Sequence, residues 1–199
     1  PYIDKVMPDT KVSRRNIPDD NQFDQQWALH NTGQSGGTID ADIDAIEAWD
    51  ISTGGVTPLG DTIVVAIVDG GMLLTHNDLI PNLWTNYGEI PGNGIDDDNN
   101  GYIDDIHGWN AYSSNGSIPS DGHGTHVAGI VGAKGNNGDY VSGVNWDVKL
   151  MALGGSSGTT SIVLEAYGYI LDQRAIYDST GGTSGAFVVA TNSSFGVNN

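Results

Sequence analysis

The sequence predicts an α/β fold with a mostly parallel sheet and helices on both faces. An unbroken, mostly apolar and β-branched run of strand length occurs at residues 62–68, and two further segments with the character of strands occur at 148–153 and 186–191. Segments with helical patterns separate them, at 123–133 and 161–178. Unbroken apolar strands are covered on both faces, and strands that alternate with helices form parallel sheets. The 199 residues, 38% of them hydrophobic, are enough to build one buried core.

A short helix and a long loop region complete the predicted elements. Residues 42–51 (DIDAIEAWDI) are predicted as a helix that ends before a Thr-Gly-Gly turn, and residues 85–121 as loops rich in Gly, Asn, Asp and Ser. The helix at 161–178 is amphipathic, with its apolar side chains at i, i+3, i+4 and i+7: Val163, Ala166, Tyr167 and Ile170. The helix at 123–133 carries small residues that allow another backbone to approach closely: Gly124, Ala128, Gly129, Gly132 and Ala133.

The chain is strongly acidic, and the charge is unevenly distributed. Seven basic and 25 acidic side chains give a net charge of -18, and residues 16–133 contain 18 Asp and Glu but no Lys or Arg. This balance argues against nucleic-acid and anionic-membrane partners, and no apolar run is long enough for a membrane span. Either bound divalent cations or a solvated acidic surface would relieve the repulsion. Without cysteine, disulfides and thiolate zinc sites are excluded.

Two side chains are candidates for the chemistry, and one of them stands at the carboxyl end of a strand, where a parallel sheet places its ligands. Asp69 follows the strand at 62–68, and His123 opens a predicted helix within the string DGHGTHVAGI. A carboxylate held at a strand end accepts the imidazole Nδ1–H, fixes the tautomer and stabilises the imidazolium. Either residue alone is as readily a turn aspartate or a surface histidine. Together they are the candidate orienting acid and general base.

The strings AIVDGG and DGHGTHVAGIVGA, 54 residues apart from Asp to His, resemble the signatures of the subtilisin-like serine peptidases, the subtilases. With THNDL at 75–79 and TNSSFG at 191–196, the resemblance extends from about Asp20 to the last residue. It implies a subtilisin-like three-layer fold, incomplete in this chain, with Asp69 and His123 as catalytic residues. It also implies that His126 packs in a helix interface and takes no part in the chemistry.

The nucleophilic serine of the resemblance is expected beyond this sequence. In subtilases it follows Asp and His, in a Gly-Thr-Ser-Met-Ala-x-Pro motif, and the oxyanion Asn is also downstream of the residues present here. The string GTSGA at 182–186 lacks the Met and the Pro and precedes a predicted strand, so Ser184 is interpreted as a loop residue. The chain is therefore predicted to be the N-terminal part of a catalytic domain, inactive alone.

Two segments that follow predicted strands are candidates for binding substrate. In the subtilase pattern they flank an extended peptide and hydrogen-bond to its main chain, which favours unfolded polypeptides of many sequences. Without the resemblance, each segment is interpreted as a simple turn. The candidate substrate-binding residues are Ser156, Ser157, Gly158, Ser194, Phe195 and Gly196.

Residues 96–104 reproduce the first nine positions of an EF-hand loop, D-x-D-x-N-G-x-I-D, and predict a calcium site. The twelfth position is His107 instead of Glu, and Asp105 is the candidate substitute. A solvated acidic loop is the alternative. The predicted ligands are the side chains of Asp96, Asp98, Asn100 and Asp104 and the carbonyl of Tyr102.

The resemblance implies a second calcium site, shared by three segments of the chain. Its side-chain ligands would be Asp78, Asn137 and an N-terminal residue, for which Asp20 is the candidate. Its carbonyl ligands would be Gly135, Asp139 and Val141.

The sequence thus predicts a secreted, calcium-dependent serine endopeptidase, with polypeptide substrates and the C-terminal remainder of the catalytic domain as partners. Residues 1–18 form an arm that resembles a propeptide tail, and residues 19–199 the N-terminal portion of the catalytic domain. One alternative is a calcium-stabilised pseudoenzyme or adhesion module of the same fold. Another is a metallohydrolase using His123, His126 and a carboxylate, which is disfavoured because HGTH lacks the acidic base of H-E-x-x-H.

Overall fold

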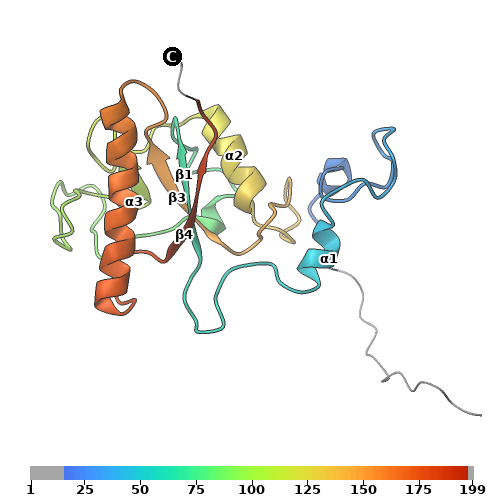
Figure 1. The fold of residues 1–199 in the computed structure, drawn as a ribbon, viewed down its shortest axis with the longest axis horizontal. Helices are drawn as coiled ribbons and strands as arrows, with labels where there is room; N and C mark the ends of the chain where they lie inside the picture. Colours follow the sequence, from blue (N-terminus) through green and yellow to red (C-terminus); the bar gives the residue numbers. More distant parts are fainter. Residues whose placement is uncertain (1–15, 197–199) are drawn as a thin grey trace, which may run out of the picture.

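A computed structural model describes residues 16–196, and its centre is a parallel sheet with helices on both faces (Figure 1). The four strands lie in the order β2-β3-β1-β4, and every neighbouring pair is parallel. They are β1 (Val64–Asp69), β2 (Gly108–Asn110), β3 (Lys149–Gly154) and β4 (Val188–Ser193). Three of them confirm the predicted strands to within two residues. The three-residue β2, inside the predicted loop region, is too short to give a periodic signal.

The two long helices, α2 (Gly122–Gly132) and α3 (Thr160–Thr180), lie on opposite sides of the sheet (Figure 1). Because side chains alternate along a strand, β1 contributes to two cores. Val64, Ala66 and Val68 pack with Ala166 and Tyr169 of α3. Ile67 packs in a second core with Val127 and Ala128 of α2. This arrangement confirms the predicted three-layer α/β fold.

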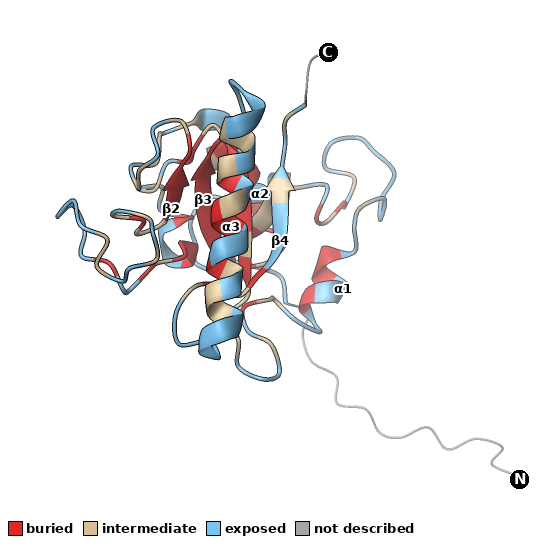
Figure 2. Cartoon of the chain, turned by 60° about the vertical axis from the view of Figure 1, so that its left-hand side comes forward, coloured by how far each residue is buried: buried red, intermediate tan, exposed pale blue. Residues whose placement is uncertain are grey.

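The buried face of α3 differs from the predicted one (Figure 2). Ala166 and Ile170 are buried as expected, but Tyr167 is 37% exposed and Val163 is only half-buried. Tyr169 and Gln173 take their place, because both donate hydrogen bonds to the buried carboxylate of Asp105. The spacing of apolar residues could not predict that Gln173 is buried, because such a pattern assigns polar residues to the surface.

The segment before β1 forms a small core of its own, joined to the loop after α2. It contains the 3-10 turn η1 (Phe23–Gln25) and the short helix α1 (Ala45–Trp49); a second 3-10 turn, η2 (Ile80–Asn82), follows β1. Residues 1–15 of the predicted arm lie outside the described residues, whereas Asn16 donates a hydrogen bond to the carbonyl of Trp49. The buried residues of this core are Phe23, Leu29, Ala45, Ile46, Trp49 and Trp146.

Candidate active site

The carboxyl end of β1 and the start of α2 meet at glycines. A Cβ added to Gly124 would lie 2.0 Å from the Gly71 carbonyl oxygen and 2.9 Å from the Asp69 Cβ, so only glycine allows this approach. Asp121 caps α2, because its carboxylate accepts a 2.6 Å hydrogen bond from the Gly124 amide. The close packing places His123, the second residue of α2, beside Asp69, the last residue of β1.

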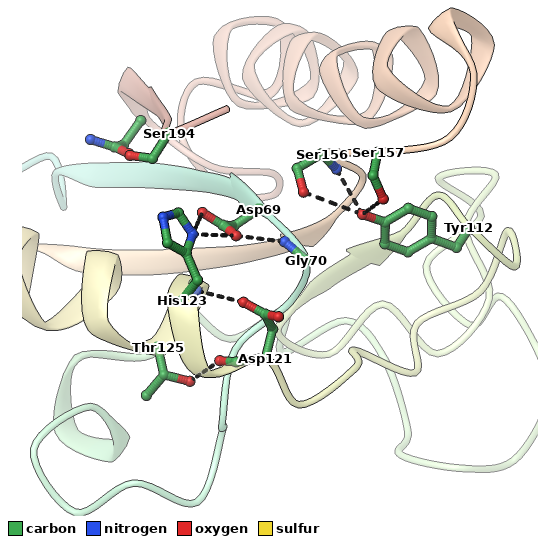
Figure 3. A network of polar contacts seen from close by, with 11 residues as sticks. Asp69, Gly70, Tyr112, Asp121, His123, Thr125, Ser156, Ser157 and Ser194 are labelled. Atoms are coloured by element: carbon green, nitrogen blue, oxygen red, sulfur yellow. Dashed lines mark hydrogen bonds and ion pairs between the residues drawn. The ribbon is translucent and has the colours of Figure 1, made fainter. Parts of the chain in front are cut away.

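The structure brings Asp69 and His123 into direct contact (Figure 3). The Nδ1 atom of His123 lies 3.0 and 2.9 Å from the two carboxylate oxygens of Asp69. Asp69 is only 4% exposed, and it also accepts a hydrogen bond from the Gly70 amide. The His123 side chain is 59% exposed, and within residues 16–196 its Nε2 atom has no hydrogen-bond partner. The pair therefore presents a braced imidazole whose second nitrogen is free to take a proton.

Asp69 also sets the protonation behaviour of His123. The hydrogen bond that the imidazole donates to Asp69, followed by the charge of Asp69 and then that of Asp121, raises the pKa of His123 above its usual value of 6.5, although desolvation opposes the shift. A raised pKa makes the imidazole a stronger base. The geometry and the pKa shift both suit proton transfer.

The two predicted substrate segments both follow the carboxyl ends of strands, one after β3 and the other after β4. Strand register pairs Asp69 with Gly154 of β3 and Val68 with Ser193 of β4. In Figure 3, Ser194 lies on one side of the Asp69–His123 pair, and Ser156 and Ser157 lie on the other. Within the described residues, the amides of Ser157, Gly158 and Gly196 have no hydrogen-bond partner. Main-chain groups without a partner at the carboxyl ends of the strands are available to hydrogen-bond with an extended peptide.

Comparison with known proteins identifies the family. The sequence profile of the subtilase family matches residues 60–195. This chain belongs to the subtilase family. It is 45% identical over 93 residues to subtilisin-like protease 1 of Plasmodium berghei, covering 46% of this chain and 16% of the relative. It is 32% identical over 176 residues to an extracellular protease of Xanthomonas campestris, covering 83% of this chain and 28% of the relative.

A solved structure shares the fold. The serine protease of Aeromonas sobria, solved in complex with a chaperone, superposes with a TM-score of 0.57 at 22% sequence identity, covering 92% of this chain and 26% of that one. The present chain thus spans less than a third of the length of these relatives. Among residues 16–196, no helix combines the length and apolar character that a membrane crossing requires.

Two other candidate residues of this subtilase are placed away from the Asp69–His123 pair. Ser184 is exposed in the turn between α3 and β4, at the end of the sheet where its parallel strands begin (the amino edge). Its amide donates a hydrogen bond to the Thr180 hydroxyl. His126 is exposed, so the prediction that it packs in a helix interface was wrong. The buried face of α2 carries Gly124, Val127 and Ala128, and His126 lies outside it. No group of three or more potential metal ligands in the described residues contains His123 and His126 together.

The acidic loop gathers carboxylates, including one that sequence reasoning missed. Potential ligand atoms of Glu89, Asp96 and Asp98 all lie within 4.8 Å of one another. Glu89 is 7% exposed, and its carboxylate accepts hydrogen bonds from the amides of Asp97, Asp98 and Asp104. The Asp104 carboxylate instead accepts bonds from the amides of Asn93 and Gly94. Glu89 precedes the nine-residue motif, so no spacing within the motif points to it.

Asp105, the predicted substitute ligand, is fully buried behind the loop. Its two oxygens accept hydrogen bonds from Asn86, Asn100, Tyr169 and Gln173. Burial raises its pKa to about 6, although these hydrogen bonds oppose the shift. Asp105 thereby ties the loop to α3.

The predicted second calcium site brings together three distant segments. Asp78 is 1% exposed, and its carboxylate accepts hydrogen bonds from the Asn137 side chain and the Val141 amide. Asp20 accepts bonds from the Asn136 amide and the Ser142 hydroxyl through Oδ2. Its other oxygen, Oδ1, is buried without a partner. A buried carboxylate oxygen without a partner is costly, and a cation bound there would satisfy it.

Proposed function

We propose that this chain carries the acid–base half of a serine endopeptidase centre, with Asp69 as orienting acid and His123 as general base. The observation that carries the proposal is the double contact from His123 Nδ1 to the buried Asp69 carboxylate, on an imidazole whose side chain is 59% exposed. The nucleophilic serine and the oxyanion Asn belong to sequence outside these 199 residues. Ser184 is not proposed for that role.

The reaction is acyl transfer from a peptide bond to serine and then to water. His123 Nε2 takes the hydroxyl proton as the serine oxygen bonds to the scissile carbonyl carbon, and Asp69 stabilises the imidazolium. The same proton passes to the leaving amine as the C–N bond breaks. A water then gives its proton to Nε2 and attacks the acyl group, and the imidazolium returns a proton to the serine oxygen. Proton transfer of this kind contributes about 10²–10⁴-fold in rate.

The substrates are extended polypeptide segments, held through their main chains. The unpaired amides of Ser157, Gly158 and Gly196 support this part of the proposal. Their two segments lie on both sides of His123, since Ser157 is on one side and Ser194 on the other (Figure 3). Main-chain recognition gives affinity with little dependence on side-chain sequence. The extracellular location named for the Xanthomonas relative supports a secreted enzyme.

Calcium is proposed at both acidic sites as a stabiliser with no part in the chemistry. The unpartnered Oδ1 of Asp20 and the clustered carboxylates of Glu89, Asp96 and Asp98 fit a hard cation with oxygen ligands. Asp78, Asn137 and the carbonyls of Gly135, Asp139 and Val141 would complete one site. Asn100 and the Tyr102 carbonyl would complete the other, and Asp104 would hold the loop.

The test uses the full-length protein that contains this chain. Hydrolysis of a fluorogenic peptide that is lost in His123→Ala and retained in His126→Ala would support the proposal. A full-length protein that binds calcium but neither hydrolyses peptides nor reacts with a fluorophosphonate would favour the non-catalytic alternative.

A further inference from the structure

Tyr112 makes polar contacts at the edge of the candidate cleft that the proposed chemistry does not use. Its hydroxyl accepts a 2.9 Å hydrogen bond from the Ser156 amide. It also lies 3.3 Å from the Ser156 hydroxyl and 3.1 Å from the Ser157 hydroxyl (Figure 3). A phenol has one proton to donate and two lone pairs to accept with, so these three partners use its full capacity.

The loop that carries Tyr112 is fixed from several directions. The Ala111 amide donates to the Gly154 carbonyl, and the Tyr112 amide donates to the Asn110 side chain. Two residues further on, the Ser114 hydroxyl donates to Glu165 on α3. The ring itself lies against the end of β3, since a Cβ added to Gly154 would be 3.4 Å from its Cδ2 atom. The phenol is therefore held on a rigid support, next to β3.

These contacts fix the start of one substrate segment. The Ser156 amide is shared between the Tyr112 hydroxyl, at 2.9 Å, and the Asp69 carbonyl, at 3.2 Å. The amides that remain unpaired begin one residue later, at Ser157. Tyr112 and the Asp69 carbonyl thus engage the Ser156 amide together, and the free main-chain amides of the segment start at Ser157.

We infer that Tyr112 is a positioning residue for substrate, which sets the register of peptides bound along residues 156–158. This inference rests on the proposed peptidase function. The effect reaches only substrates long enough to lie on that segment, because Tyr112 makes no hydrogen bond to the side chain of Asp69 or His123 in the described structure. Short substrates that occupy only the region of His123 do not use it.

The test compares Tyr112→Phe with wild type in the full-length enzyme, on two substrates. One is a fluorogenic peptide with four residues before the scissile bond, and the other is an ester of a single amino acid. Loss of one or two neutral hydrogen bonds is expected to raise KM for the peptide about three- to tenfold. For both substrates kcat should stay within about twofold, and KM for the ester should not change. Tyr177→Phe is the matched control, because it removes a tyrosine hydroxyl bond to Asp61 at the far end of α3.

A second variant makes the result specific to the contact. Ser157→Ala should raise KM for the peptide in the wild-type background and have little further effect in Tyr112→Phe, because both remove the same hydrogen bond. Equal losses on peptide and ester, or an unchanged peptide KM in Tyr112→Phe, would overturn the inference. Wild-type protein without activity would remove the proposed function, and the inference with it.

Discussion

The two ends of the parallel strands, the amino edge and the carboxyl edge of the sheet, differ in the groups that donate hydrogen bonds to their aspartates. At the amino edge, Asp61 accepts hydrogen bonds from the hydroxyls of Tyr177 and Thr57, each 2.7 Å long. At the carboxyl edge, Asp69 accepts one from the imidazole of His123. A hydroxyl does not change its charge near neutral pH, whereas an imidazole does. Similar hydrogen bonds therefore stabilise the structure at the amino edge and orient a candidate general base at the carboxyl edge.

The edges also differ in shape, and the pocket at the amino edge lies away from the Asp69–His123 pair. A pocket of about 590 Å³ opens at the amino edge, lined by Trp84, Ser184 and Phe187 among others. None of its lining residues is a histidine, and it contains neither Asp69 nor His123. The carboxyl edge offers unpaired amides beside a braced imidazole. The chemistry of the side chains, more than the volume of a cavity, therefore points to the carboxyl edge as the place of the candidate site.

The largest expected effect separates two histidines of α2. In the full-length enzyme, His123→Ala should lower kcat for peptide hydrolysis by about six orders of magnitude, because the general base is lost. His126→Ala, three residues further along the helix and exposed, should stay within about twofold of wild type. Activity of His123→Ala within tenfold of wild type would reject its role as base.

Equivalent substitutions of the two aspartates probe the edges directly. Asp69→Asn should lower kcat by about three to four orders of magnitude, because an amide neither fixes the Nδ1–H tautomer nor stabilises the imidazolium. Asp61→Asn removes a carboxylate from the amino edge and should leave kcat within about twofold. Steady-state kinetics on one peptide measure both, and equal losses would contradict the division between the edges.

The pH profile sharpens the same contrast. The base must be neutral to act, so kcat/KM should fall as the pH drops through a pKa above 6.5 in wild type, and this acid limb should move to lower pH in Asp69→Asn. The contribution of this contact to the stability of the folded state depends on pH in the opposite sense to kcat/KM. The Asp69–imidazolium contact stabilises the folded state fully below pH 6.5, and this contribution is lost as the pH rises through the raised pKa. An acid limb that does not move would show that Asp69 does not control His123.

Calcium removal should lower the stability of the folded protein, whereas the substitutions at the two edges are measured through kcat. Binding to the folded state at a hundredfold excess over Kd stabilises by about 2.7 kcal/mol, so chelation should lower Tm by roughly 5–10 °C. Asp20→Asn should reduce this shift, whereas Asp24→Asn, an exposed acid four residues away, should not. Thermal unfolding with and without chelator measures it, and an unchanged Tm would contradict the calcium proposal.

The smallest expected effect is at Ser184. Ser184→Ala should leave activity unchanged, because the residue lies in an exposed turn at the amino edge. Peptide mapping after fluorophosphonate treatment should find no label on Ser184. Labelling there would mean that the amino edge carries the nucleophile.

The sequence predicted those features whose signals are local. The strand runs, the helix at His123 and the Asp and His strings were each readable within a few residues, and the pairing of Asp69 with His123 was implied by the resemblance of those strings to the subtilase signatures. Asp121 was also accessible, since an aspartate before a helix is a common N-cap.

Features that depend on contacts between distant segments were missed or wrong. Glu89 approaches Asp96 and Asp98 only because its loop folds back, and Tyr112 reaches Ser156 from 44 residues away in the chain. Tyr169 replaced Tyr167 on the buried face of α3 because of a hydrogen bond to Asp105, 64 residues away. Periodicity describes the order of residues along one element and contains no information on its partners.

The most direct test of the central claim is the rate at which a fluorophosphonate labels the full-length protein, compared between wild type and His123→Ala. This reagent reports on an activated serine without needing substrate binding. We predict rapid labelling of one serine beyond residue 199 in wild type and a loss of at least about a thousandfold in His123→Ala. Equal labelling rates in the two proteins would contradict the assignment of His123 as the base.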